Sequence, residues 1–229
     1  MKVGIHQSNF MPWVGYFKKI KFCDKFVFLE NVKCSKNSFF NRNRFSTSKK
    51  RNDYFWLTCP LSKTSYKQNL SEVECNSDFL SKHIKHFKLR YRKTNEKQYL
   101  EELLSFYEST RDEDKVLLSN FNKNIIAMTC KYLDIETEII SSLNIKNINK
   151  LKKQDLVIGI VKALSGKVYI SGQGAKDYQD EKYFNEAGIE LKYLRSDYSK
   201  VSKISNEHVS IVDIILQEGI WKTKKMILH

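Results

Sequence analysis

A compact group of polar side chains near the amino terminus has the chemistry of a catalytic site. His6 ends the β-rich segment Lys2–His6, and Gln7 and Asn9 follow it before an expected helix. An imidazole titrates near neutral pH, so His6 is suited to act as a general base or as a donor to a developing charge. The alternative is that His6 only holds its loop in place by hydrogen bonds. We take His6, Gln7 and Asn9 as candidate catalytic residues, with His6 as the base.

A second group combines amides and guanidinium groups just past the second β-rich segment, which ends near Asn31. Asn41, Arg42 and Arg44 lie within four residues of one another. Arginine presents paired N–H donors that match the oxygens of phosphate or carboxylate, so these residues are predicted to bind the diphosphate of a substrate. The alternative is a loop whose asparagines favour turns.

A third group lies between an expected strand and an expected helix. Ser171, Gly172, Gly174 and Tyr178 belong to it, and the two glycines let the backbone approach a ligand closely. The run lacks both the six-residue dinucleotide fingerprint and the eight-residue phosphate-loop pattern. By itself it therefore does not identify a ligand.

Histidine and cysteine spacing gives no metal site. Lys82, His83 and His86 fall on one expected helix face, where a solvated or phosphate-facing pair is favoured over a metal because a third ligand is missing. The five cysteines are odd in number and form no CxxC pair. They are expected to be buried free thiols and not disulfides or zinc ligands.

The elements that must position these groups read as an α/β fold. Lys25–Glu30 contains an almost unbroken apolar run, typical of a parallel strand covered on both faces, and Pro12–Phe22 has apolar residues at helical spacing. We also expect strands at Tyr54–Leu57, Leu70–Cys75, Val168–Ser171 and Ile189–Leu194, and helices opening at Asp78 and Asp112 and spanning Tyr99–Tyr107, Gln154–Leu164, Gly174–Ala187 and Ile211–Gln217.

The order of these elements predicts one mostly parallel sheet with helices on both faces and a helical insert in the middle of the chain. Residues 1–77 and 134–229 form the two halves of the α/β core, and residues 78–133 form the insert or cap. Ligands of parallel sheets collect at the carboxyl ends of strands. The histidine, the arginine pair and the paired glycines are therefore expected to meet around one cleft.

Composition restricts the possible partners. The 229 residues carry a formal charge of +14, and the segments Lys33–Arg51 and Lys82–Lys93 contain no acidic residue. This pattern suits an anionic small molecule or nucleotide, a solvated basic face, or nucleic acid, and the excess of lysine over arginine disfavours the last. No apolar run reaches the roughly 18 to 20 residues of a membrane span, and no signal peptide is recognised, so we expect a cytoplasmic protein without a membrane partner.

These residues together resemble the WbqC-like family. The resemblance rests on His6-Gln7-x-Asn9-x-x-Pro12-Trp13-x-Gly15-Tyr16-Phe17-x-Lys19-Ile20, Asp24-x-Phe26-Val27-Phe28-Leu29, Ser35-Lys36, Asn41-Arg42-Asn43-Arg44, Trp56-Leu57-Thr58-x-Pro60, Lys82-His83, Ser171-Gly172-x-Gly174-x-x-x-Tyr178 and Ser210-Ile211-Val212-Asp213. Ser8 departs from the proline usual in that family, which alters the stiffness of the loop but removes no chemical group. With Asn41, Arg42, Arg44, Ser171, Gly172, Gly174 and Tyr178, the residues Tyr16, Asn31 and His83 complete the candidate substrate-binding residues.

The resemblance implies a bacterial cytosolic enzyme of O-antigen, lipopolysaccharide or other surface-glycan biosynthesis. It implies transfer of an acyl or aminoacyl group onto the amine of a nucleotide-linked amino sugar, with acyl-CoA or ATP as candidate cofactors and a homo-oligomer left open. One alternative is an ATP-dependent, adenylate-forming ligase acting on a small carboxylate, because the opening block is also similar to that of pantothenate synthetase-type enzymes. Another is a non-catalytic basic module that binds nucleic acid.

Overall fold

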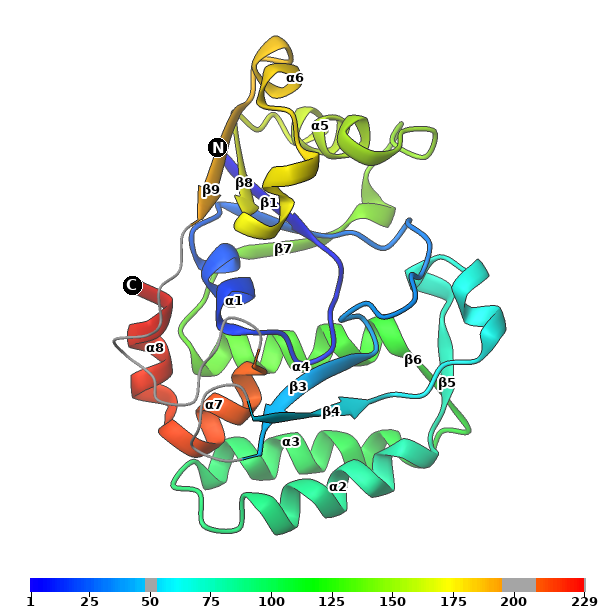
Figure 1. Ribbon diagram of the computed structural model, residues 1–229, viewed down its shortest axis with the longest axis vertical. Coiled ribbons are helices and arrows are strands. Elements are labelled where there is room, and N and C mark those ends of the chain that lie inside the picture. The colour runs from blue at the N-terminus through cyan, green and yellow to red at the C-terminus, as the bar shows by residue number, and fades with distance from the viewer. Residues whose placement is uncertain (48–52, 195–208, 229) are drawn as a thin grey trace.

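A parallel sheet forms the centre of the molecule. The computed structural model describes residues 1–47, 53–194 and 209–228. In this part of the chain five parallel strands lie in the order β7-β2-β1-β8-β9 (Figure 1). They are β1 (Lys2–His6), β2 (Lys25–Phe28), β7 (Glu138–Ser141), β8 (Val168–Gly172) and β9 (Glu190–Leu194). The α/β fold class predicted from the sequence is confirmed.

The chain winds outward from the middle of this sheet in two directions. It first runs from β1 through β2 to β7, and then returns to the other side of β1 with β8 and continues to β9. Numbered by their order in the chain, the strands read 3-2-1-4-5, as in doubly wound nucleotide-binding sheets. The direction reverses between β1 and β8, so the loops after these two strands diverge and leave a crevice there.

Both faces of the sheet are covered, and the alternation of side chains explains how. Val3, Ile5 and Val27 belong to a core cluster with residues of α5 and α6, whereas Phe26 and Phe28 belong to a second cluster with α1. The helices concerned are α1 (Val14–Lys21), α5 (Lys153–Ala163) and α6 (Glu181–Glu186).

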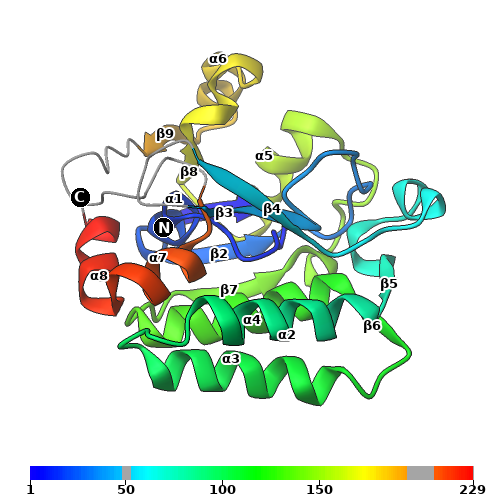
Figure 2. The ribbon, with the colours of Figure 1, turned by 60° about the horizontal axis from the view of Figure 1, so that its bottom comes forward.

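Further helices and short strands pack beyond α1, at the opposite end of the molecule from α5 and α6 (Figures 1 and 2). The helices are α2 (Asp78–Arg90), α3 (Lys97–Thr110), α4 (Leu118–Tyr132), α7 (Ile211–Glu218) and α8 (Ile220–Leu228), and the short strands are β3 (Arg42–Ser46), β4 (Tyr54–Thr58), β5 (Glu74–Asn76) and β6 (Lys115–Leu117). The 3₁₀ turns are η1 (Lys63–Lys67), η2 (Leu70–Glu72), η3 (Ser142–Asn144), which follows β7, and η4 (Gln173–Tyr178), which follows β8. The α1-side core cluster extends without a break into α2, α3 and α4.

Several elements differ from the sequence prediction. Tyr54–Leu57 was expected in the main sheet, but β4 pairs antiparallel with β3 in a separate hairpin. Leu70–Cys75 forms a 3₁₀ turn followed by the three-residue strand β5. The helix expected to open at Asp112 begins only at Leu118, because residues 115–117 pair with β5. The long helix expected over Gly174–Ala187 is divided into η4 and α6.

Two further expectations can be compared with the structure. All five cysteines are buried and free, as predicted. Within the described ranges, no helix combines the length and apolar character needed to cross a bilayer.

Candidate functional site

A cavity of about 600 Å³ opens at the crevice between β1 and β8. Its walls come from the carboxyl ends of these strands, the first turn of α1 and the η4 turn. Seven of the sequence-predicted residues line it, namely His6, Gln7, Asn9, Tyr16, Ser171, Gly172 and Gly174. The structure thus brings together the first and third groups recognised in the sequence.

His6 is held at the end of β1 by its aromatic neighbours. The strand register places it beside Phe28, on the face of the sheet that α1 covers. Its ring lies 5.7 Å from the Trp13 ring and 5.0 Å from the Tyr16 ring, both edge to face. Nδ1 lies 3.3 Å from the carbonyl oxygen of Gln7. A carbonyl can only accept, so this contact assigns the proton to Nδ1 and leaves Nε2 with a lone pair.

The environment keeps His6 neutral at pH 7. Burial, and to a smaller extent the charge of nearby Lys19, lowers its pKa to about 3. A neutral imidazole can accept a proton, but a pKa this low makes it a weak base until another charge enters the cavity.

The loop after His6 is anchored at several points. The hydroxyl of Tyr16 and the main-chain N–H of Asn9 both donate to the carbonyl of Gln7, at 2.8 and 2.9 Å. The carbonyl of Ser8 accepts a hydrogen bond from Asn122 of α4 at 2.7 Å. The buried Oδ1 of Asn9 has no hydrogen-bond partner among the described residues. An unpaired buried acceptor is costly, so Asn9 is suited to receive a donor from a ligand.

Lys19 is a cavity residue that the sequence analysis did not select. Its side chain is buried in α1, where Nζ donates to the carbonyl of Ile5 at 2.7 Å and lies 5.4 Å from the centre of the Tyr169 ring. Burial lowers the pKa of Lys19 to about 8. The signal in the sequence was its position three residues after Tyr16, on the helix face that also carries the apolar residues.

The glycine-containing turn forms the opposite wall. Ser171 is buried, and its hydroxyl donates to the side chain of Gln179 at 2.8 Å. A Cβ added at Gly172 or Gly174 would meet no atom within 4 Å. The backbone here is therefore open on the cavity side, as close approach by a ligand requires. The side chain of Tyr178 lies outside the described part of the chain.

The arginine pair lies beside the cavity but does not line it. The guanidinium of Arg42 is 4.3 Å from the Trp56 ring, and that of Arg44 is 4.5 Å from the Tyr54 ring. Arg44 is also 5.9 Å from the ring of Phe39, which does line the cavity. Neither arginine forms an ion pair with a described residue, and both Nε atoms are buried without a partner there.

The other three predicted residues have partners away from the cavity. The Asn41 amide donates to the carbonyl of Cys59 at 2.8 Å, and the Asn31 amide oxygen accepts from Ser142 at 3.0 Å. His83 was expected in a solvated or phosphate-facing pair, but its side chain is buried in the core. It lies one turn from Phe79 on the apolar face of α2, which is why it points inward.

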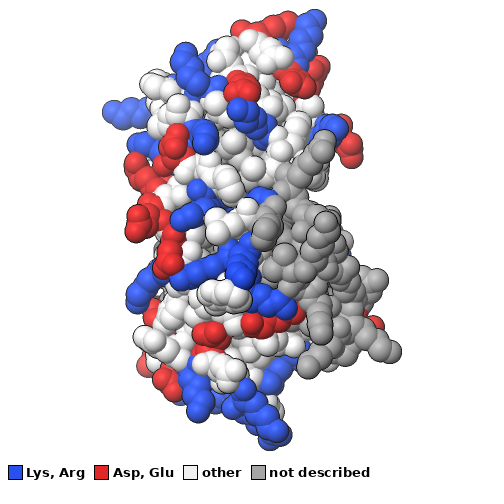
Figure 3. Space-filling view, turned by 90° about the vertical axis from the view of Figure 1, so that its left-hand side faces the viewer, with Lys and Arg blue, Asp and Glu red and all other residues white. Residues whose placement is uncertain are grey.

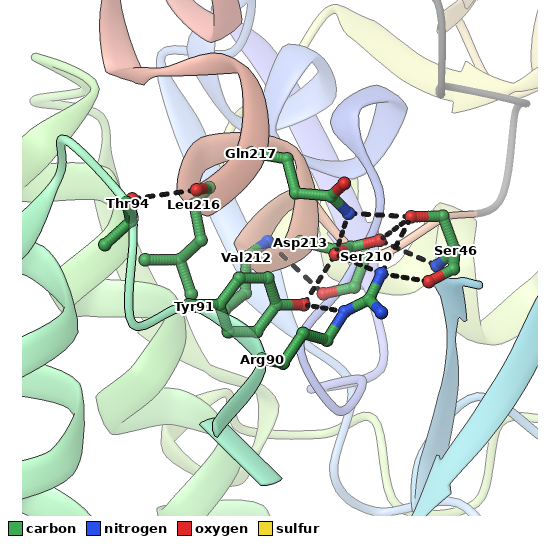
Figure 4. Close-up of polar contacts among 9 residues, drawn as sticks. All are labelled: Ser46, Arg90, Tyr91, Thr94, Ser210, Val212, Asp213, Leu216 and Gln217. Atoms are coloured by element: carbon green, nitrogen blue, oxygen red, sulfur yellow. Dashed lines mark hydrogen bonds and ion pairs between the residues drawn. The ribbon is translucent and has the colours of Figure 1, made fainter. Parts of the chain in front are cut away.

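A second dense polar cluster fixes the hairpin that carries the arginines (Figure 4). The fully buried carboxylate of Asp213, on α7, accepts hydrogen bonds from Ser46 at the end of β3 and from Tyr91 after α2. It also accepts one from Gln217 and lies 3.7 Å from a guanidinium nitrogen of Arg90. The cluster ties α2 and α7 to β3, so it positions the arginine-bearing strand and is not open to a ligand.

Surface charge gives little support to a nucleic-acid interface on one side of the molecule. Figure 3 shows lysine and arginine side chains interspersed with aspartate and glutamate on the face that it presents. A site for nucleic acid typically gathers its basic residues into one patch or stripe.

Comparison with known proteins supplies the remaining evidence. A model of the WbqC-like protein family matches residues 7–225. The uncharacterized protein Rv1507c of Mycobacterium tuberculosis (strain ATCC 25618 / H37Rv) is 27% identical over 225 residues, which cover 95% of this chain and 94% of that protein. No solved structure matches.

Proposed function

The chain belongs to the WbqC-like protein family, and from this premise we propose that it is a surface-glycan biosynthetic enzyme acting on a nucleotide-linked amino sugar. In this proposal it transfers an acyl or aminoacyl group to the sugar amine. The observation that carries the proposal is the place of the cavity. It lies at the switch point of a 3-2-1-4-5 parallel sheet, where doubly wound folds bind nucleotides.

The lining suits a sugar nucleotide. Trp13, Tyr16 and Tyr169 offer aromatic surface for a sugar or a base, and Gln7 and Gln179 offer amides for hydroxyl groups. Because no acidic residue is among the residues that line it, the cavity tolerates an anionic ligand.

The chemistry requires a free amine and a stabilised oxyanion. In the proposed step, the amine nitrogen attacks the acyl carbonyl carbon, a C–N bond forms, and the bond to the donor's leaving group breaks. His6 accepts the proton that the nitrogen loses. The main-chain N–H groups at Gly172 and Gly174 are the proposed donors to the tetrahedral oxyanion. Arg44 lies beside the cavity residue Phe39, and the arginine pair is proposed to contact the diphosphate.

The second candidate is an adenylate-forming ligase acting on a small carboxylate. The same sheet order and the histidine-bearing turn before α1 favour it, because ATP would occupy the same switch point. In this case a carboxylate attacks the α-phosphate of ATP and pyrophosphate leaves, and a nucleophile such as an amine then attacks the acyl carbon of the acyl adenylate and displaces AMP. The product therefore appears only with ATP. The transferase with an acyl-CoA donor needs no ATP.

Product formation tests the proposal. Purified protein would be incubated with UDP- and dTDP-linked amino sugars, with either acyl-CoA or ATP plus a carboxylate, and masses would be followed by liquid chromatography and mass spectrometry. We expect one donor to give N-acylated sugar nucleotide, and His6→Ala and His6→Asn to lower its rate about 10²- to 10⁴-fold. His86→Asn is the matched control, since His86 is a half-buried histidine outside the cavity. A wild-type rate in both His6 variants would remove the assignment of His6 as base.

The nucleic-acid alternative has its own test. Binding of that kind should weaken steeply as salt is raised, with a linear fall of log affinity against log salt concentration. Oligonucleotide binding with such a slope, and no product in the incubations above, would favour the binding module over the enzyme.

A further inference from the structure

Lys19 is a buried cation with no carboxylate partner in residues 1–47, 53–194 and 209–228, and it lines the same cavity as His6. The residue is 5% exposed. Its Nζ donates a hydrogen bond to the carbonyl oxygen of Ile5, which carries no net charge. No carboxylate of the described residues forms an ion pair with Lys19, whereas several lysines on the surface are paired with glutamates.

The buried carboxylate just after β2 is already neutralised by another cation. Glu30 follows β2 and is fully buried, but its Oε1 accepts from Lys123 at 2.8 Å and from Ser119 at 2.9 Å. Its Oε2 accepts from Ser141. Glu30 therefore has its own counter-charge and hydrogen bonds, and does not serve Lys19.

An unpaired buried ammonium destabilises the protein unless something else compensates it. Transfer of a charge from water to a protein interior is unfavourable, and one carbonyl acceptor offsets only part of the penalty. The low pKa of Lys19 is a sign of the same penalty. A negatively charged ligand in the cavity would offset it, and Gly15, in the first turn of α1, lies on the same wall at the positive end of the helix dipole.

We propose that the ammonium group of Lys19 binds an oxyanion group of the ligand, either a carboxylate or a phosphate, inside this cavity. The inference deepens the proposed function, since it names the charged group held at the same site. It does not depend on group transfer being observed, because anion binding can be measured alone.

Anion binding at Lys19 also affects His6. The positive charge of Lys19 is one of the causes that hold the pKa of His6 low, and an anion next to the ammonium would oppose that effect. His6 would then become a stronger base when the ligand is present than when the cavity holds only water. The lysine and histidine thus act in sequence, the first as an anion-binding residue and the second as the base.

Thermal unfolding in the presence of simple anions tests the inference. Sodium acetate, phosphate and pyrophosphate would each be compared with sodium chloride at equal ionic strength. The wild-type Tm should rise with the logarithm of the concentration of at least one of these oxyanions. Preference for acetate would identify a carboxylate as the natural group, and preference for phosphate or pyrophosphate would identify a phosphate.

Two variants separate the role of Lys19 from general charge. Lys19→Met should keep or raise the Tm without anion and should need at least tenfold more anion for the same shift. Lys21→Met is the matched control, because Lys21 is on the same helix, donates to the carbonyl of Asp134 at 2.6 Å and lies outside the cavity. It should behave as the wild type towards anions. No wild-type shift beyond that of chloride, or an equal shift in Lys19→Met, would overturn the inference.

A second measurement covers the case in which Lys19→Met does not fold. In wild-type protein labelled with ¹³C at the lysine ε carbon, the Lys19 signal should titrate near pH 8, well below the value of about 10.4 of a lysine in water. Saturating phosphate or acetate should raise the midpoint of that signal. An unchanged midpoint would contradict anion binding at Lys19, whereas failure of the transferase assay alone would leave the anion result standing.

Discussion

The main-chain N–H and the hydroxyl of Ser46 both donate to the same carboxylate oxygen of Asp213, each at 2.7 Å, across 167 residues of chain. Asp213 is fully buried, and Tyr91 donates to its other oxygen at 2.5 Å. The carboxylate therefore joins the end of the β3–β4 hairpin to α7. Since β3 also carries Arg42 and Arg44, this acidic side chain helps to position the arginine pair.

Asp213→Asn should destabilise the protein strongly. The substitution replaces one acceptor oxygen with an N–H₂ donor that faces groups which themselves donate, and it leaves Arg90 without its counter-charge. We expect a loss of about 3–5 kcal/mol in the free energy of unfolding, measured by urea denaturation. Glu190→Gln is the control, because its exposed pair with Lys192 should contribute less than about 1 kcal/mol. Equal effects of the two substitutions would contradict the structural role of Asp213.

Stability should fall as the pH is lowered from about 6.5 towards 3, and His83 should contribute to that fall. Burial lowers the pKa of His83 from 6.5 to about 3, so between these values the unfolded chain binds a proton that the folded chain does not. The free energy of unfolding therefore decreases as the pH falls through this window.

The measurement is urea unfolding at several pH values between 7 and 4, in the wild type and in His83→Phe. The phenyl ring keeps the contacts that His83 makes with the rings of Phe10 and Phe79 but cannot take up a proton. The variant should show a shallower dependence on pH, whatever its stability at pH 7. Parallel curves for the two proteins would show that His83 is not responsible.

The sequence predicted the strands with clear apolar runs and missed those that depend on tertiary contacts. Phe26-Val27-Phe28 alternates between two covered faces, and β2 formed as expected. In contrast, β3 contains Arg42-Asn43-Arg44, a composition typical of loops. Asn43 is nevertheless fully buried, because its amide donates to the carbonyls of Phe10 and Met11. Such partners are 32 or more residues away and cannot be inferred from local pattern.

Part of the candidate site could likewise be predicted from the sequence, and part of it could not. His6 and Gly172 were expected to meet because carboxyl ends of parallel strands share one edge, and both line the cavity. Lys19 was missed because a lysine within an amphipathic helix is normally solvated, and only the packing of α1 on the sheet buries it. The place of Arg44 beside Phe39 follows from the β3–β4 hairpin, which local composition did not indicate.

Arg44→Lys should weaken nucleotide-sugar binding without unfolding the protein. A lysine keeps the charge but loses the planar stacking on Tyr54 and Trp56 and the paired N–H donors. We expect about a tenfold increase in Kd by calorimetric titration, which corresponds to about 1.4 kcal/mol. Arg111→Lys is the control, because Arg111 is exposed and pairs only with Glu108 at 3.1 Å among the described residues. If Arg44→Lys binds as tightly as this control, the arginine pair does not contact the ligand.

Gly172→Ala should weaken binding without changing stability, whereas Gly188→Ala should lower stability without changing binding. Gly172 has a φ of −86° and open space around it, so an added methyl group strains nothing and the Tm should not change. The methyl group would nevertheless enter the cavity that Gly172 lines and hold a ligand away from the backbone, which should raise Kd several-fold.

Gly188 has a φ of +73° after α6, so alanine there should cost about 1 kcal/mol of stability and leave binding unchanged. Unfolding curves and calorimetric titrations of both variants measure the two effects separately. Unaltered Kd in Gly172→Ala would mean that the ligand does not approach the backbone at this turn, and the oxyanion donors would then have to come from another wall of the cavity.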